Sequence, residues 1–304
     1  AHPAFFEGLR EFLDHGDAPR RAHFVVGNHN PELLYPEVQL FIRTKLGRFE
    51  GVDFPGFELQ LGRVHIEHGS QLDPMFVMPP HRPFLDYRGA RILNLSWGSV
   101  AILDTVMALK PLLAFHQRLL PRQTVFQLMP EVRELIAGAF WRYYTRDYWK
   151  GYLGRRDPTK KLSWAMVKEL VVRFGTRNAD VHIGASLQQR LARDDSVRLY
   201  VLGHLHRPAL YSHGDRKILQ AGCLRNEYML VDSETLRPMP KGYVEAYCRD
   251  GVPLRSHDVE IEGPPAPPGY VPDSVLDVLP EVRRLLATRQ ARSERAARRR
   301  AERG

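Results

Sequence analysis

The chain lacks several features that would assign it to common classes of protein. It has two cysteines in 304 residues, Cys223 and Cys248, so at most one disulfide can form and a reduced compartment is expected. No apolar run reaches the roughly eighteen residues of a membrane-spanning helix. Neither a signal peptide nor an internal repeat is visible. With 43% hydrophobic and 26% charged residues, we expect a globular, cytoplasmic protein.

The net charge of +9 is concentrated in two segments. Residues 101–179 carry 14 Lys/Arg against 6 Asp/Glu, and residues 283–304 carry 9 Arg against 2 Glu. Solvated helix faces would explain this excess. Attraction to a phosphate-bearing substrate, to nucleic acid or to an anionic membrane would explain it too, so peripheral membrane contact stays an open alternative.

Hydrophobic periodicity predicts helices and short strands along the first hundred residues. A helix over Pro3–His15 precedes a buried strand at His23–Val26, and a second helix is expected from Pro36 to Leu46. Phe57–Leu61 and Val64–Glu67 alternate in the manner of paired strands. This mixture predicts an α/β protein.

The pattern changes at about residue 100. Residues 100–180 are predicted to be almost wholly helical and to form an inserted cap, and residues 263–304 a Pro-rich linker with a basic tail. Residues 1–99 and 181–262 would then be two parts of one domain. The second part is expected to begin with a strand at Val197–Leu202. The short strands that follow it are expected to form an antiparallel sheet, and they are Ala209–Ser212, Lys217–Gln220, Tyr228–Val231 and Tyr243–Cys248.

Polar residues typical of metal ligands follow three of the predicted strands, each beside a glycine. Gly27–Asn30 has the sequence Gly-Asn-His-Asn, His68 precedes Gly69, and Gly203–His206 has the sequence Gly-His-Leu-His. Imidazole nitrogens and an amide oxygen suit Mn, Fe, Zn or Ni better than Ca or Mg. Because ligands from several strand ends can meet at one edge of a sheet, we expect these side chains to converge.

This ordered set resembles the motifs of the calcineurin-like metallophosphoesterases, which include Gly-Asn-His-Asp/Glu, then His-Gly, then Gly-His-x-His. The resemblance implies an α/β fold of two packed mixed β-sheets flanked by helices, with an inserted helical cap. It also implies two divalent metal ions, with Mn as the first expectation and Fe, Zn or Ni as alternatives. Asn28, His68 and His204 would bind one metal, and His206 would bind the other.

The resemblance further implies hydrolysis of a phosphoester or pyrophosphate bond by a hydroxide that bridges the two metals. Asn28 would help to hold the phosphate, and His29 would protonate the leaving oxygen. The family usually has Asp or Glu where this chain has Asn30. Asn30 would therefore orient His29 without a charge, which predicts a less basic His29 and a lower-pH optimum.

Three further residues are candidates for the surroundings of the site. Asp73 is either a partner of a ligand or a turn residue, and Arg207 is either a phosphate contact or a surface arginine. Asn226 is a candidate for lining the site.

Two motifs of the family, D-x-H and G-D-x-x-D, do not precede Gly27. By the resemblance, their aspartates would bridge the metals and complete the second site. His15–Asp17 lies at the end of the first predicted helix and is interpreted as a helix stop. Because neither motif is present, we expect the chain to be N-terminally truncated. The missing segment would carry two strands, and without them the chain would be weakly stable or poorly soluble alone.

The expected cap contains an aromatic and basic segment, Phe126–Tyr152. Its position is similar to that of the helical insert in the subfamily that hydrolyses UDP-diacylglucosamine, so a nucleotide-linked lipid is one candidate substrate. A packed lid core explains the aromatic residues equally well, and a nuclease that stacks single-stranded bases is a further alternative. A catalytically inactive member serving as a binding or scaffold module is the rival from another class.

Overall fold

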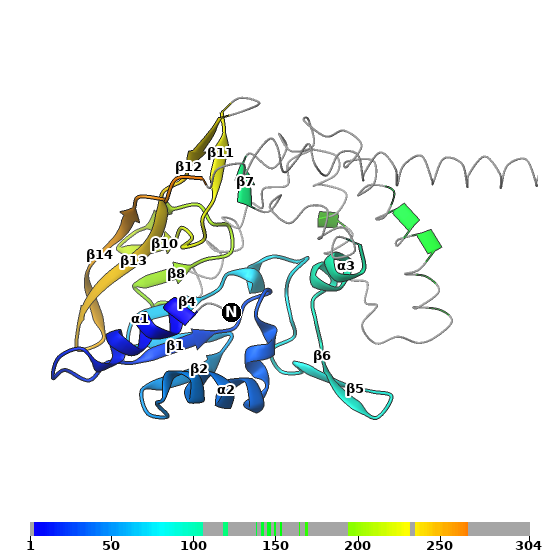
Figure 1. Cartoon of the computed structure of the whole chain (residues 1–304), viewed down its shortest axis with the longest axis horizontal. Coiled ribbons are helices and arrows are strands. Elements are labelled where there is room, and N and C mark those ends of the chain that lie inside the picture. The colour runs from blue at the N-terminus through cyan, green and yellow to red at the C-terminus, as the bar shows by residue number, and fades with distance from the viewer. Residues whose placement is uncertain are drawn as a thin grey trace, which may run out of the picture. The chain divides into compact units, whose positions relative to one another are not determined.

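A computed structural model of the chain describes residues 3–105, 118–120, 194–231 and 235–266, with isolated positions between 138 and 169. The described residues form a mixed α/β structure with several sheets and few helices (Figure 1). The expected cap and basic tail lie largely outside these residues, as does Phe126–Tyr152.

The chain divides into two compact units. The first takes in Ala1–Ser99, Pro158–Cys223 and Gly242–Val259, and the second takes in Val100–Asp157, Leu224–Lys241 and Glu260–Gly304. The predicted metal ligands all belong to the first unit.

The first unit begins with two helices and a pair of parallel strands. Pro36 occupies the first turn of the second helix, where its missing N–H costs nothing, and Gly47 ends that helix with φ 66°. The elements are α1 (Pro3–Asp14), β1 (Ala22–Val25), the 3-10 helix η1 (Pro31–Leu34), α2 (Pro36–Leu46) and β2 (Val52–Gly56).

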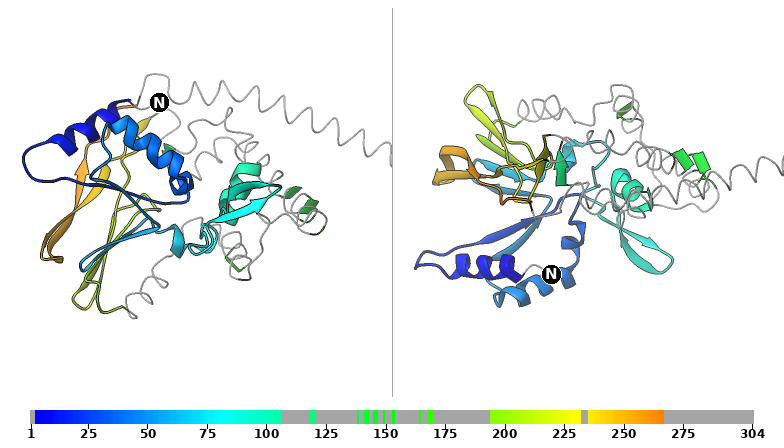
Figure 2. Two further views of the ribbon diagram at one scale, coloured as in Figure 1. Left: turned by 90° about the horizontal axis from the view of Figure 1, so that it is seen from below. Right: turned by 45° about the horizontal axis from the view of Figure 1, so that its top comes forward.

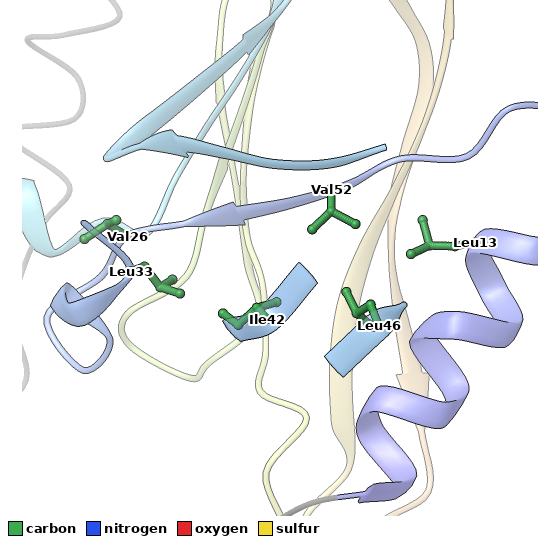
Figure 3. Packing of buried hydrophobic residues seen from close by; sticks show 6 residues of the cluster. All are labelled: Leu13, Val26, Leu33, Ile42, Leu46 and Val52. Atoms are coloured by element: carbon green, nitrogen blue, oxygen red, sulfur yellow. The ribbon is translucent and has the colours of Figure 1, made fainter. Parts of the chain in front are cut away.

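Both helices pack against the β1–β2 pair (Figures 1 and 2). Leu13 of α1, Leu46 of α2 and Val52 of β2 are buried in one apolar cluster, together with Val26 after β1 (Figure 3). Burying a side chain of this kind stabilises the fold by roughly 1.5–3 kcal/mol. This cluster holds the loop after β1 in place.

A five-stranded sheet forms the centre of the first unit. Its strands, in spatial order, are β3 (Glu58–Leu61), β4 (Val64–Glu67), β8 (Leu199–Leu202), β10 (Arg216–Gln220) and β9 (Ala209–His213). β8 is parallel to β4 and to β10, and the outer pairs are antiparallel. The antiparallel pairing expected of the short strands that follow Val197–Leu202 is confirmed for β9 and β10. The β9–β10 hairpin reverses the chain and places β10, rather than β9, beside β8.

The central strands are buried on both faces, as parallel strands usually are. Tyr200 and Ile218 face one cluster with Leu72, and Leu199 and Leu219 face another, against which Val244 packs. This alternation follows from the two-residue period of a strand. It leaves the strand ends as the place where polar side chains can emerge.

The remaining elements are the 3-10 helix η2 (Ser70–Leu72), the hairpin of β5 (Phe84–Tyr87) and β6 (Ala90–Leu93), helix α3 (Trp97–Thr105), and the two-stranded sheet of β13 (Lys241–Arg249) and β14 (Val252–Ile261). The second unit contains a small sheet of β12 (Leu236–Pro238), β11 (Tyr228–Leu230) and β7 (Leu119–Leu120). Of these, β7 falls in the segment predicted to be helical. Two residues are too few to leave a strand pattern in the sequence.

Within the described part of the chain, no helix is long and apolar enough to cross a membrane. Neither Cys223 nor Cys248 forms a disulfide.

Candidate metal centre

The second and third predicted motifs leave the five-stranded sheet side by side. β4 and β8 are parallel with Glu67 opposite Leu202, so the next residues, His68 and Gly203, are neighbours at the carboxyl edge. The Gly203 N–H donates a hydrogen bond to the His68 carbonyl at 3.0 Å. Two segments more than 130 residues apart therefore form one rim, as parallel pairing requires.

Histidine rings meet at this rim. The ring centroids of His68 and His204 are 5.3 Å apart, and Phe76 covers His204 with its own ring centroid at 5.6 Å. His204 and His206 have φ angles of 72° and 58°. Left-handed backbone is unfavourable for residues with a Cβ and is often found where function requires it. The two histidines therefore do not follow the alternation of an extended strand.

The loop after β1 is brought to the same place by a close contact. A Cβ added to Gly27 would lie 2.4 Å from Cδ2 of His68, so only glycine lets the backbone pass the ring. The next residue, Asn28, is buried, whereas His29 is exposed. All three predicted motifs thus contribute to one cluster.

The side chain of Asn30 shapes this loop. Its Oδ1 accepts a hydrogen bond from the Gly27 N–H at 2.6 Å, and its Nδ2 donates one to the Val25 carbonyl at 3.3 Å. Asn30 therefore closes the turn that presents Asn28 and His29. Its expected hydrogen bond to the His29 ring stays a prediction.

Two buried polar atoms of the cluster are candidates for binding a cation. Asn28 Oδ1 and His68 Nδ1 have no hydrogen-bond partner among the residues that the structure describes. An unsatisfied buried polar atom costs about 1–3 kcal/mol. An amide oxygen and an imidazole nitrogen each offer a lone pair to a divalent metal ion, so this pair fits a metal site.

The electrostatics of His68 favour the neutral ring that a metal requires. Burial of the ring is the main cause of a lowered pKa, and repulsion from neighbouring histidines adds to it, which brings the pKa of His68 to about 3. The neighbours are His204, His29 and His206. His68 therefore stays neutral at physiological pH, with its lone pair free of a proton.

Asp73 closes a turn and also lies beside His204, a predicted metal ligand. Its Oδ1 accepts a hydrogen bond from the Met75 N–H at 3.0 Å, which closes a turn, and its Oδ2 lies 3.2 Å from Nε2 of His204. The carboxylate is fully buried. A carboxylate on one ring nitrogen fixes the tautomer of a histidine and leaves the other nitrogen for a metal. For His204 that nitrogen is Nδ1.

The remaining candidates lie in different surroundings. His206 is half-buried and Arg207 is exposed, with the Arg207 carbonyl accepting a hydrogen bond from Gln220. Asn226 belongs to the second unit, next to Arg225 and Glu227, which form an ion pair. A phosphate contact by Arg207 and a lining role for Asn226 stay predictions.

Two residues that lie beside predicted ligands, Gly27 and Cys223, were not predicted to do so. Gly27 belongs to the first motif, but its contact with His68 joins segments that follow strands of two separate sheets. Cys223 lies near His206, with Sγ and a ring nitrogen within 4.8 Å. The sequence signal that could have indicated Cys223 is its position just after the predicted strand Lys217–Gln220. Its approach to His206 depends on the parallel pairing of β10 with β8.

A scan of protein-family models and a search of curated proteins gave no match to the chain.

Proposed function

We propose that the protein is a metal-dependent hydrolase of a phosphoester or pyrophosphate bond, with the two-sheet sandwich of the calcineurin-like metallophosphoesterases. One observation carries the proposal. Asn28 Oδ1 and His68 Nδ1 are buried without a hydrogen-bond partner among the described residues, inside a cluster of histidines from separate strand ends. Such an arrangement costs stability unless a cation binds there.

The donor set indicates which residues would hold the metals. Asn28, His68 and His204 would hold one divalent ion and His206 a second, with Mn, Fe, Zn or Ni suited to these ligands. Bound ions would polarise the phosphoryl group and make water a stronger nucleophile. Asp73 would keep the His204 ring in its ligating tautomer and raise its basicity.

His29 is the residue suited to proton transfer. It is exposed, yet it lies near enough to His68 to influence the pKa of that ring. A substrate phosphate held beside the buried ligands would therefore place its leaving group within reach of solvent and of His29. Imidazole can donate a proton near neutral pH, so His29 would protonate the leaving oxygen as the ester bond breaks.

Candidate substrates are a nucleotide-linked lipid, a small phosphoester and a nucleic acid. The segment that would distinguish them, Phe126–Tyr152, lies largely outside the described residues. Synthetic aryl phosphates report cleavage of the bond without a specific binding pocket, so they suit a first test.

The test measures hydrolysis of p-nitrophenyl phosphate and its bis-ester by the full chain, with Mn²⁺ or Zn²⁺ and with a chelator. We expect turnover that the chelator abolishes. His68→Ala should lower turnover about 1,000-fold or more, because a metal ligand supports several kcal/mol of transition-state stabilisation. The exposed His213 of β9 provides a matched control, and His213→Ala should leave turnover unchanged.

Turnover that survives the chelator, or that His68→Ala leaves intact, would overturn the proposal. Absence of both turnover and metal binding in the wild-type chain would instead favour a binding or scaffold module.

A further inference from the structure

Cys223 lies beside a proposed metal ligand. Its Sγ and a ring nitrogen of His206 are within 4.8 Å of each other, and both side chains are half-buried. The other cysteine, Cys248, is exposed on β13. The two thiols of the chain therefore occupy different environments.

The parallel pairing of β8 and β10 brings Cys223 to the rim. Leu202 lies opposite Gln220 at the last position of both strands, so residues 203–206 and 221–223 leave the sheet at the same edge. The Ala221 N–H donates to the Leu202 carbonyl at 2.7 Å, and Gln220 Nε2 donates to the Arg207 carbonyl at 2.6 Å. These hydrogen bonds tie the segment just before Cys223 to both ends of the loop that contains His206.

A second contact holds the Cys223 backbone. The Gly242 N–H at the start of β13 donates to the Cys223 carbonyl at 3.3 Å. A Cβ added to Gly222 would lie 3.0 Å from the Gly242 Cα, so the two segments approach closely and leave little room for a side chain at Gly222. The thiol is thus presented from a supported loop, as a metal ligand requires.

We propose that Cys223 Sγ is a ligand of the metal ion held by His206. Metal–sulfur and metal–imidazole bonds are about 2.3 Å and 2.0–2.1 Å long in zinc sites. A sulfur and a nitrogen ligand of one ion therefore lie within about 4.4 Å of each other. Cys223 Sγ and the His206 ring nitrogen are at most 4.8 Å apart, so only a small side-chain movement is needed for both to bind one ion. On binding, the thiol proton passes to solvent and a sulfur–metal bond replaces the S–H bond.

This inference rests on the proposed metal centre and refines its metal preference. Thiolate is a soft ligand that favours Zn²⁺, Co²⁺ or Fe²⁺, whereas Mn²⁺ favours carboxylate and water oxygens. A cysteine ligand beside His206 would therefore make the site prefer these ions over Mn²⁺, the ion that the motifs alone suggest. The ligand chemistry predicts tighter binding of Zn²⁺ and Co²⁺ than of Mn²⁺.

The test uses Co²⁺ as an optical probe in the full chain, with metal content measured in parallel. We expect a thiolate-to-cobalt charge-transfer band in the near ultraviolet of the wild type. Cys223→Ser should remove the band and weaken Co²⁺ binding by about 10-fold or more, since even the loss of an outer-shell partner costs 10- to 100-fold. Cys248→Ser should keep both the band and the affinity.

The possible outcomes separate the two proposals. Cobalt that binds with visible ligand-field bands but without a charge-transfer band, or with a band that persists in Cys223→Ser, would overturn the role of Cys223 and leave the metal centre standing. Failure of the folded wild type to bind Co²⁺, Zn²⁺ or Mn²⁺ would overturn both. A loss of structure in Cys223→Ser is checked by circular dichroism, and Cys223→Ala then serves as the second variant.

Discussion

Two regions of the first unit are buried in opposite ways. Beneath α1 and α2, Leu13, Leu46 and Val52 pack in a cluster made only of apolar side chains. At the carboxyl edge of the central sheet, buried atoms of Asn28 and His68 have no hydrogen-bond partner among the described residues. The first region gains free energy from burial, and the second loses it. Sites that break local rules in this way are where function is expected.

The two regions should therefore respond differently to substitution. Substitutions in the apolar cluster should change the free energy of unfolding and leave the metal centre intact. Substitutions at the strand ends should change metal binding or turnover and cost little stability.

His29→Ala is expected to lower turnover by roughly 100- to 10,000-fold, the usual contribution of general acid catalysis. Because His29 is exposed and is not assigned as a ligand, metal content should stay at the wild-type level. Steady-state kinetics combined with metal analysis of the same sample would check this. Unchanged turnover would remove His29 from the mechanism, and loss of metal would make it a ligand.

Leu46→Ala should destabilise the protein by about 2–5 kcal/mol, because it leaves a cavity in the cluster under α2. Leu46 is fully buried, whereas Leu40 of the same helix is exposed. Leu40→Ala should change stability by no more than about 0.5 kcal/mol. Denaturant unfolding gives both values, and equal effects of the two variants would contradict the described packing.

Gly27→Ala should weaken metal binding by about 10- to 100-fold, the range found when a residue that positions a metal ligand is mutated. The added methyl group would lie 2.4 Å from the His68 ring and would have to displace it. Gly8 of α1 has open space around it, so Gly8→Ala is the control and should not alter metal affinity. Equal affinities of both variants in a metal titration would show that the His68 ring does not depend on Gly27.

The metal-free protein should lose stability as the pH falls below about 6.5. The pKa of His68 is lowered to about 3 in the folded state, so between these values the unfolded chain binds the proton and the folded chain does not. The loss should be roughly 2 kcal/mol between pH 7 and pH 5. Urea unfolding of chelator-treated protein would measure it, with His68→Gln as the control that should flatten the slope.

Much of the local structure was predictable. The helices at Pro3–Asp14 and Pro36–Leu46 follow from apolar spacing, Pro36 and Gly47, and the hairpin of β3 and β4 follows from its alternation. The strands Val52–Gly56 and Val252–Ile261 were missed. The first contains a proline and a glycine, which disfavour a strand, and the second alternates weakly because most of it is partly exposed.

The amino-acid sequence by itself determined the residue types of the candidate site and their position at strand ends, because glycines and histidines beside short apolar runs leave a local signal. Tertiary structure alone decided which of them meet. The contact of Gly27 with His68, the carboxylate of Asp73 on His204 and the approach of Cys223 to His206 all join segments distant in the chain. Strand order and parallel register create such contacts, and neither is encoded in the spacing of any one segment.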